Sequence, residues 1–258
     1  MRDAGTQHPS TLAMLIYGIN AVLEALRAGR VKELRVADRP PSGRIVEAVQ
    51  AAVRDGIDVR RVRSADLDRA ARGGVHQGVV AQLVEADRFD IPTLVASAHG
   101  AALIVVLDGI EDPHNVGAIL RSVDAAGADG VVRQSRRAAP LGGAAAKVSA
   151  GAVSHVRIAE VVNIARALGE LKEAGVWTIG LATASSARYD LLDLTLPTAF
   201  VLGSEQNGLR RLVREHCDSV VSIPMRGHVQ SLNVAVAAGI VLFEAARQRL
   251  GQVSVGKA

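Results

Sequence analysis

Along the first third of the chain, the spacing of apolar positions switches between a helical period and a strand period. Spacings of three and four residues indicate amphipathic helices, and alternation or short apolar runs indicate strands. This succession is typical of a small α/β unit. We expect Asn20 and Ser64 to cap the first and third helices. Helices are predicted over 17–29, 43–56 and 64–71, and strands over 33–38, 57–62 and 78–84.

The rhythm is interrupted at residues 86–99, which contain a proline and no clean period, so a linker is predicted there. It resumes with 103–110, an almost wholly apolar strand of the kind buried in a parallel sheet. Repeated strand–helix alternation predicts an α/β fold with a doubly covered parallel sheet. The predicted domains are therefore 13–85 and 100–250. Further strands are predicted over 130–133, 176–183, 199–205 and 220–224, and helices within 111–130, 144–151, 160–175 and 207–218.

The last long apolar block, 223–249, predicts a helix that is apolar on almost every side. Polar residues stand only at its entrance, at Gln230, Ser231 and Asn233. Ser231 is the expected N-cap, with Asn233 two residues inside the helix. A polar entrance to a buried helix favours a site at the helix N-terminus. The alternative is that these residues are caps and nothing more.

A second group of candidate residues lies in the segment DGIEDPHNVGAILR (108–121). Pro113 pre-sets a turn, and Asn115 can cap the helix that follows. Arg121 lies six residues after Asn115, or 240° around a helix, so the two converge only if Asn115 sits in the approach turn. The alternative is a simple cap and a solvated arginine.

A third segment, LGSEQNGL (202–209), directly follows an apolar strand, where open α/β sheets bind ligands. Gly203 and Gly208 bracket a polar loop that contains Glu205. The alternative is an ordinary turn with Asn207 as a helix cap. The segment is neither GxGxxG nor GxxxxGK[ST], which removes the main support for a dinucleotide or P-loop site.

Composition narrows the class of protein. Aromatic residues make up only 2% of the 258 residues, and the net charge is +4, which permits an anionic partner such as RNA. The single cysteine, Cys217, allows no disulfide within the chain and fits a reducing compartment. The longest apolar run is too short to span a bilayer, and there is no signal-peptide pattern, so we expect a cytoplasmic protein. The histidines show no metal-ligand spacing, so no metal is expected.

Taken together, these segments resemble the SpoU/TrmH (SPOUT) family of RNA ribose methyltransferases over about 17–249. The segments 17–29 and 73–81 (GGVHQGVVA) further resemble the subgroup with a small RNA-binding domain. The three motifs that carry the resemblance are N…G…R in 115–121, LGSEQNG in 202–208, and IPM…SLNV…AAG in 223–239.

The resemblance implies a C-terminal parallel sheet with a deep trefoil knot, S-adenosylmethionine as cofactor and a homodimer. It implies a ribosomal-protein-like RNA-binding fold for the N-terminal unit and, as the substrate, a guanosine ribose in large-subunit 23S ribosomal RNA. Alternatives are a transfer RNA ribose methyltransferase, a resistance-type ribosomal RNA methyltransferase, and a catalytically dead RNA-binding or ribosome-assembly protein.

The resemblance also implies the site residues. Arg121 would be the base that activates the 2′-hydroxyl, although a guanidinium resists deprotonation and could instead hold a phosphate or stabilise an alkoxide. The implied catalytic set is Asn115, Arg121, Glu205, Ser231 and Asn233, and the implied cofactor contacts are Thr183, Gly203, Ile223, Met225 and Leu232. Candidate RNA contacts are Arg133, Arg136 and Arg137 beside the site, and Arg60, Arg61 and Arg63 in the N-terminal unit.

Overall fold

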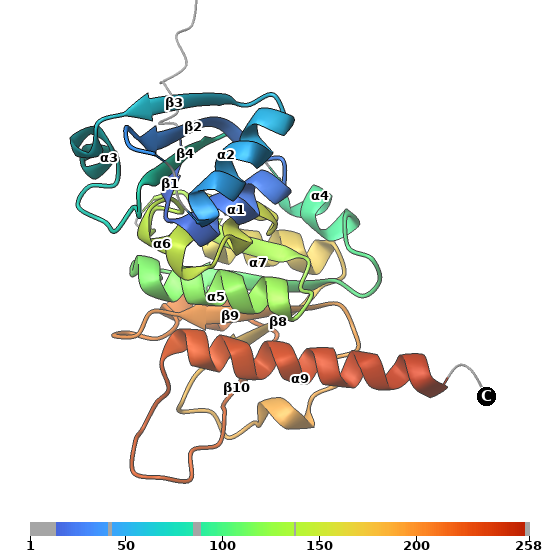
Figure 1. Ribbon diagram of the computed structural model, residues 1–258. Coiled ribbons are helices and arrows are strands. Elements are labelled where there is room, and N and C mark those ends of the chain that lie inside the picture. Colours follow the sequence, from blue (N-terminus) through green and yellow to red (C-terminus); the bar gives the residue numbers. More distant parts are fainter. Residues whose placement is uncertain (1–13, 41–42, 85–88, 137, 256–258) are drawn as a thin grey trace, which may run out of the picture.

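The computed structural model describes residues 14–40, 43–84, 89–136 and 138–255 (Figure 1). The expected tail at 1–12, the first residues of the expected linker and Arg137 lie outside these ranges. The described residues form two sheets, one in each half of the chain. The boundaries 13–85 and 100–250 stay a prediction.

The N-terminal sheet has the strand order β1-β4-β2-β3 in the described residues. β2 and β3 are parallel, whereas β4 runs antiparallel to both β1 and β2. The six elements predicted here are confirmed, and the three-residue β1 is additional because it is too short to show a period. The elements are β1 (Leu15–Tyr17), α1 (Ile19–Arg27), β2 (Val31–Ala37), α2 (Arg44–Arg54), β3 (Asp58–Val62), α3 (Ser64–Ala70) and β4 (Val79–Leu83).

The two predicted caps of this unit are wrong. Gly18 occupies the N-cap position of α1, and Arg63 that of α3. The backbone N–H of Ile19, the first residue of α1, donates instead to the side-chain oxygen of Gln77, at 3.0 Å. A partner 58 residues away satisfies the helix end, so local sequence does not reveal it.

The second sheet has the strand order β10-β8-β9-β5-β6-β7 in the described part of the chain, and every pair is parallel. This confirms the predicted α/β fold with a parallel sheet. The strands are β5 (Leu103–Asp108), β6 (Gly130–Gln134), β7 (Ile158–Val161), β8 (Trp177–Leu181), β9 (Thr198–Gly203) and β10 (Ser219–Val221). The helices are α4 (Ile91–Ala96), α5 (Pro113–Ala125), α6 (Ala144–Val148), α7 (Ile164–Glu173), α8 (Arg211–His216) and α9 (Val234–Val255).

Helices cover both faces of this sheet, as the fully buried β5 requires. Leu103, Val105 and Leu107 pack into the core shared with α5 and α9, whereas Ile104 and Val106 face the core under α4, α7 and α8. The N-terminal unit lies against the α5 side, where Gly143 N–H donates to the Leu15 carbonyl at 3.1 Å (Figure 1).

Two parts of the second unit differ from the sequence prediction. The segment predicted as a linker contains α4, whose N-cap Asp90 accepts a hydrogen bond from Thr93 N–H at 2.8 Å. Ile91 and Leu94 of this helix are buried, which explains why it is ordered. The predicted helix 160–175 begins later, because β7 occupies residues through Val161.

The helix α9 is buried on one side only, which corrects the expectation of burial all round. Val234, Ala238 and Val241 lie in the core, whereas Val236 and Phe243 are each 52% exposed and Leu250 is 70% exposed. The last three are seven residues apart and so form one stripe along the helix. Among the described helices, none has the length and apolar character needed to cross a membrane.

Candidate functional site

The candidate catalytic and cofactor residues other than Arg121 gather at the edge of the second sheet where the strands end. Because all its strands are parallel, the loops after β5, β8, β9 and β10 emerge at the same edge. This edge carries the first turn of α5, the loop 204–210, and the segment 222–233 that leads into α9.

The first turn of α5 presents Asn115 to this edge. Asp112 is the N-cap, and its side chain accepts from His114 N–H at 2.8 Å. Asn115 is the third residue of the helix, so the prediction that it caps the helix is wrong. Its side chain is available for other contacts, and Nδ2 donates to Asp112 Oδ2 at 3.2 Å.

Asn115 joins all three sequence motifs. Its Nδ2 also donates to Oε1 of Glu205, in the loop after β9. Its Oδ1 accepts from Nδ2 of Asn233, at 2.9 Å, immediately before α9. Residues 90 and 118 positions away along the chain therefore meet at one half-buried amide.

Asn233 has a second role as the N-cap of α9. Its Oδ1 accepts from Ala235 N–H at 2.9 Å and from Val236 N–H at 3.4 Å. The predictions that Ser231 is the cap and that Asn233 lies inside the helix are therefore wrong. Ser231 is exposed and makes no hydrogen bond within the described ranges, two residues before Asn233.

The loop that carries Glu205 is a tight turn closed on itself. Ser204 and Gly208 exchange two backbone hydrogen bonds, of 3.1 and 2.8 Å. A Cβ atom at Gly203 would collide with the backbone of Gly208 and Leu209, so only glycine fits there. Asn207 is not a helix cap, since α8 begins at Arg211 with Arg210 in the N-cap position.

Arg121 does not reach this cluster within one chain. It lies in α5 together with Asn115, six residues apart, so the two side chains leave the helix in different directions. Arg121 is exposed and has no hydrogen bond or ion pair in the part of the chain that the structure describes.

The five residues expected at the cofactor flank the same edge. Thr183 follows β8 and Gly203 ends β9, while Ile223, Met225 and Leu232 belong to the segment after β10. Thr183 is exposed, and the three apolar side chains are half-buried.

Ser222 was not singled out in the sequence, yet it ties two of these loops together. Its N–H donates to the Ala187 carbonyl at 2.8 Å, and its Oγ donates to the Ser185 carbonyl at 2.9 Å. Its own carbonyl accepts from Tyr189 N–H at 3.2 Å. The loop after β8 is thereby joined to the segment after β10, and no local pattern marks a serine for this role.

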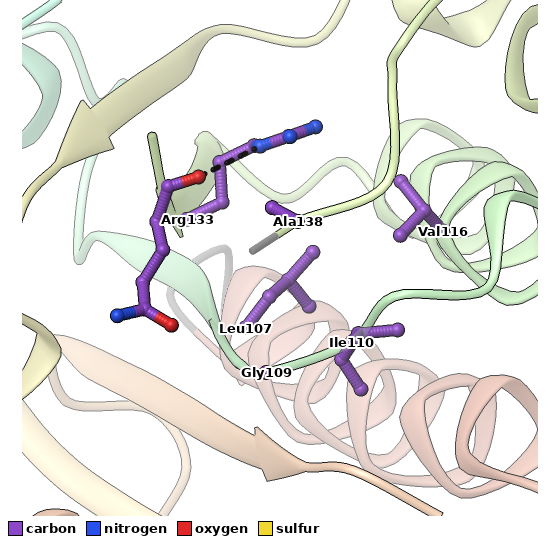
Figure 2. Close-up of a pocket in the computed structure, with 7 residues that line it drawn as sticks. Leu107, Gly109, Ile110, Val116, Arg133 and Ala138 are labelled. Carbon is purple, nitrogen blue, oxygen red and sulfur yellow. Dashed lines mark hydrogen bonds between the residues drawn. The ribbon is translucent and has the colours of Figure 1, made fainter. Parts of the chain in front are cut away.

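Arg133 lines a small pocket at the end of β6, beside Leu107, Ile110 and Val116 (Figure 2). The residue is only 5% exposed, and burial lowers the pKa of its guanidinium. Nη2 donates to the Ala139 carbonyl at 2.7 Å, and Nε lies 3.6 Å from Glu160. Arg133 therefore holds the loop after β6 and presents little charge to solvent.

The other arginines considered as RNA contacts are exposed where the structure describes them. Arg60 pairs with Asp58 at 2.7 Å, and Arg63 lies 3.4 Å from Asp66. Arg61 and Arg136 are exposed without an ion pair in the described ranges. These two are the stronger candidates for phosphate contacts.

Two features of the described residues bear on cofactor chemistry. They contain no group of three or more His, Cys, Asp and Glu side chains arranged to hold a metal ion. Burial raises the pKa of the Cys217 thiol to about 11, so this cysteine is protonated at neutral pH.

Two known families match the chain. The family described as "SpoU rRNA Methylase family" matches residues 102–243. The family described as "RNA 2′-O ribose methyltransferase substrate binding" matches residues 15–88.

Similar proteins extend over nearly the whole chain. The 23S rRNA (guanosine-2′-O-)-methyltransferase RlmB of Xanthomonas campestris is 44% identical over 92% of this chain and 97% of its own length. RlmB of Salmonella typhimurium is 40% identical over 92% of this chain and all of its own length. The crystal structure of the SpoU methyltransferase AviRb from Streptomyces viridochromogenes with AdoMet has a TM-score of 0.76 and 28% identity, and it covers 92% of this chain and 90% of that one.

Proposed function

Because the chain belongs to the SpoU rRNA methylase family, we propose that it methylates the ribose 2′-hydroxyl of a guanosine in 23S rRNA, with S-adenosylmethionine as methyl donor. The two RlmB proteins described above are named for this reaction and match along almost their full length. The solved AviRb structure contains AdoMet, which supports the choice of donor.

The observation that carries the proposal is the meeting of Asn115, Glu205 and Asn233 at one edge of the sheet. Neither a cap nor a surface turn requires side chains from three distant segments to bond to one another. Asn115 fixes the Glu205 carboxylate, which we assign to bind the 2′-hydroxyl and orient it. Ser231, exposed two residues before Asn233, completes the polar side of the site.

We assign the loops after β8, β9 and β10 to hold the methyl donor. When bound, the donor supplies an electrophilic methyl group on a sulfonium. Half-buried Ile223, Met225 and Leu232 offer apolar surface to its ring and chain, while Thr183 and the backbone at Gly203 offer polar contacts. A largely apolar wall suits a reaction in which a positive charge disappears, and fixed orientation supplies much of the rate.

We assign Arg121 to the site of a second copy of the chain. It precedes Ser122, whose Oγ faces Gly239 of α9, so it lies beside the helix with the exposed stripe Val236, Phe243 and Leu250. Exposed apolar surface of this kind is typical of subunit contacts. A homodimer formed through the stripe would bring Arg121 to the partner's site, where its permanent charge suits a developing alkoxide.

The trefoil knot also belongs to the proposal. The hydrogen bonds of Ser222 join the loop after β8 to the segment before α9. α9 then returns to the far end of the same loop, where Gln248 bonds Leu194 N–H at 2.9 Å and the Leu192 carbonyl at 3.1 Å. This double attachment supports a loop through which the segment before α9 is threaded.

The test is to map 2′-O-methylation of ribosomal and transfer RNA from a strain that lacks the gene. Loss of one 23S rRNA guanosine methylation, restored by the wild-type gene and not by an Asn115→Ala variant, is expected. Loss of a 2′-O-methylation in transfer RNA instead would show that transfer RNA, not 23S rRNA, is the substrate. Absence of S-adenosylmethionine binding in calorimetry would contradict the enzymatic function.

A further inference from the structure

We propose that Asp108 and Arg210 form a clamp that positions Glu205 against Asn115. The inference rests on the proposed role of Glu205. Both clamp residues lie outside the Asn115–Glu205–Asn233 cluster, so they act through the loop that carries Glu205.

The first half of the clamp is a buried carboxylate. Asp108 is the last residue of β5, and its side chain is 0% exposed. A carboxylate removed from water must be paired and hydrogen-bonded. Within the described residues, Asp108 forms an ion pair with Arg210 and with no other residue. The guanidinium of Arg210 is half exposed.

Arg210 meets Asp108 with both its backbone and its side chain. The backbone N–H donates to Oδ2 at 2.9 Å, and Nε donates to Oδ1 at 2.6 Å. Nη2 pairs with the same Oδ1. Contacts from the main chain and from a planar guanidinium fix both the position and the direction of the chain at this point.

The loop that holds Glu205 both starts and ends at Asp108. Gly203, which precedes the loop, pairs with Asp108 in the register between β9 and β5. Arg210, which ends the loop, returns to the Asp108 side chain. With Ser204 and Gly208 bonded to each other between these points, the backbone that carries Glu205 is held at both ends of the loop.

Asp108 also precedes the other half of the site. Asn115 follows it by seven residues, through a short connection and the first turn of α5. The segments that carry Asn115 and Glu205, the two partners of this hydrogen bond, are therefore both anchored at the buried Asp108. Releasing the clamp would let Glu205 shift, and misplacing a catalytic group by about 1 Å can lower turnover by about a hundredfold.

A purely structural ion pair is the alternative, and the same sheet supplies a control in a less buried carboxylate. At the amino end of β8, Asp218 accepts from Thr178 N–H at 2.8 Å and pairs with Lys172 at 2.9 Å. This carboxylate also pins a strand by a backbone N–H and a cation, but at the opposite edge from the site.

The experiment uses the neutral pair Asp108→Asn/Arg210→Gln, which leaves no buried charge without a partner and so favours folding. Single-turnover methylation of a 23S rRNA fragment is measured for this variant, for Glu205→Ala and for their combination. The control is Asp218→Asn/Lys172→Gln. Thermal melting and S-adenosylmethionine binding are recorded for each protein.

The neutral clamp variant is expected to lose on the order of ten- to a hundredfold in rate and to bind the methyl donor normally. In the Glu205→Ala background the same change should cost less than about twofold, because the group that the clamp positions is absent. The control should keep its rate.

Equal losses in both backgrounds, or the same loss in the control, would overturn the clamp and leave the proposed function intact. Full turnover in Glu205→Ala would instead overturn the proposed role of Glu205, and the clamp with it.

Discussion

Asn233 Nδ2 donates a 2.9 Å hydrogen bond to Asn115 Oδ1, and this bond ties the start of α9 to the first turn of α5. Because Oδ1 of Asn115 is occupied by Asn233, its Nδ2 is directed to Glu205 and Asp112. The pair thus sets which atom of Asn115 faces each neighbour.

Two substitutions of Asn233 separate its role as the N-cap of α9 from its hydrogen bond to Asn115. Asn233→Ala should lower the free energy of unfolding by about 1 kcal/mol and also lower turnover, because both functions are lost. Asn233→Ser keeps a capping oxygen, so its stability should stay near wild type while turnover falls. Chemical denaturation and single-turnover rates distinguish the two effects. Wild-type turnover in Asn233→Ser would show that the amide is not needed.

Gly203→Ala should weaken binding of S-adenosylmethionine. The added Cβ meets the backbone of Gly208 and Leu209, so the loop must move away from the edge of the sheet. Gly169→Ala in α7 is the matched control, because open space surrounds that position. It should stabilise the protein by up to about 1 kcal/mol without changing affinity. Titration calorimetry measures the affinity for S-adenosylmethionine, and scanning calorimetry measures the stability. Equal affinities for the two variants would contradict the prediction.

Val236→Glu should convert the proposed homodimer into a monomer and abolish methylation. The substitution places a charge at the amino-terminal end of the exposed stripe on α9. Leu212→Glu is the control, since Leu212 is also 52% exposed but lies on α8. Light scattering after size-exclusion chromatography gives the mass of each variant. A monomeric wild-type protein with full activity would disprove the subunit contact.

RNA affinity should fall steeply with salt, and Arg61→Ala and Arg136→Ala should each reduce the slope of log K against log[salt] by about one. Both side chains are exposed and unpaired in the described ranges. Arg166→Ala is the control, because Arg166 is exposed on α7 and paired with Glu170 at 3.1 Å. Filter binding from low to high salt measures the slopes. An unchanged slope in both variants would remove these arginines from the interface.

Cys217 should react slowly with a maleimide at pH 7 to 8. Burial raises the pKa of its thiol to about 11, so the reactive thiolate is scarce in the native protein. The unfolded chain loses this proton near pH 8.5, so the Cys217 contribution to stability declines as the pH rises from there toward 11. Labelling rates with and without guanidinium test the shift. Fast native labelling at pH 7 would refute it.

Much of this fold was predictable because its strands and helices carry their own periodicity. The continuous apolar run in 103–110 predicts a buried parallel strand, and β5 is one. The helix α4 is not predictable from periodicity, because six residues are too few to show a helical period. Burial of Ile91 and Leu94 under a neighbouring helix stabilises it instead.

The site was predictable as three motifs but not as an arrangement. Nothing local distinguishes Asn115 as the residue that links Glu205 and Asn233, because these partners are set by the strand order. Asp112 and Asn233, not Asn115 and Ser231, cap the helices, since several polar residues compete at each entrance. No sequence pattern marks Asp108 for its role, because a single aspartate at the end of a strand has no distinguishing spacing.

The strand order has a consequence for how the protein is made. β9 (Thr198–Gly203) inserts between β8 and β5, so this strand pairs along its whole length only after 203 residues have been synthesised. Asn233 follows later still, and without it Oδ1 of Asn115 lacks its hydrogen bond and α9 lacks its cap. We therefore expect a nascent chain that ends before residue 233 to be inactive, since it lacks part of the proposed site. Folding should be slow, governed by distant contacts, and the enzyme should gain activity only in its final step.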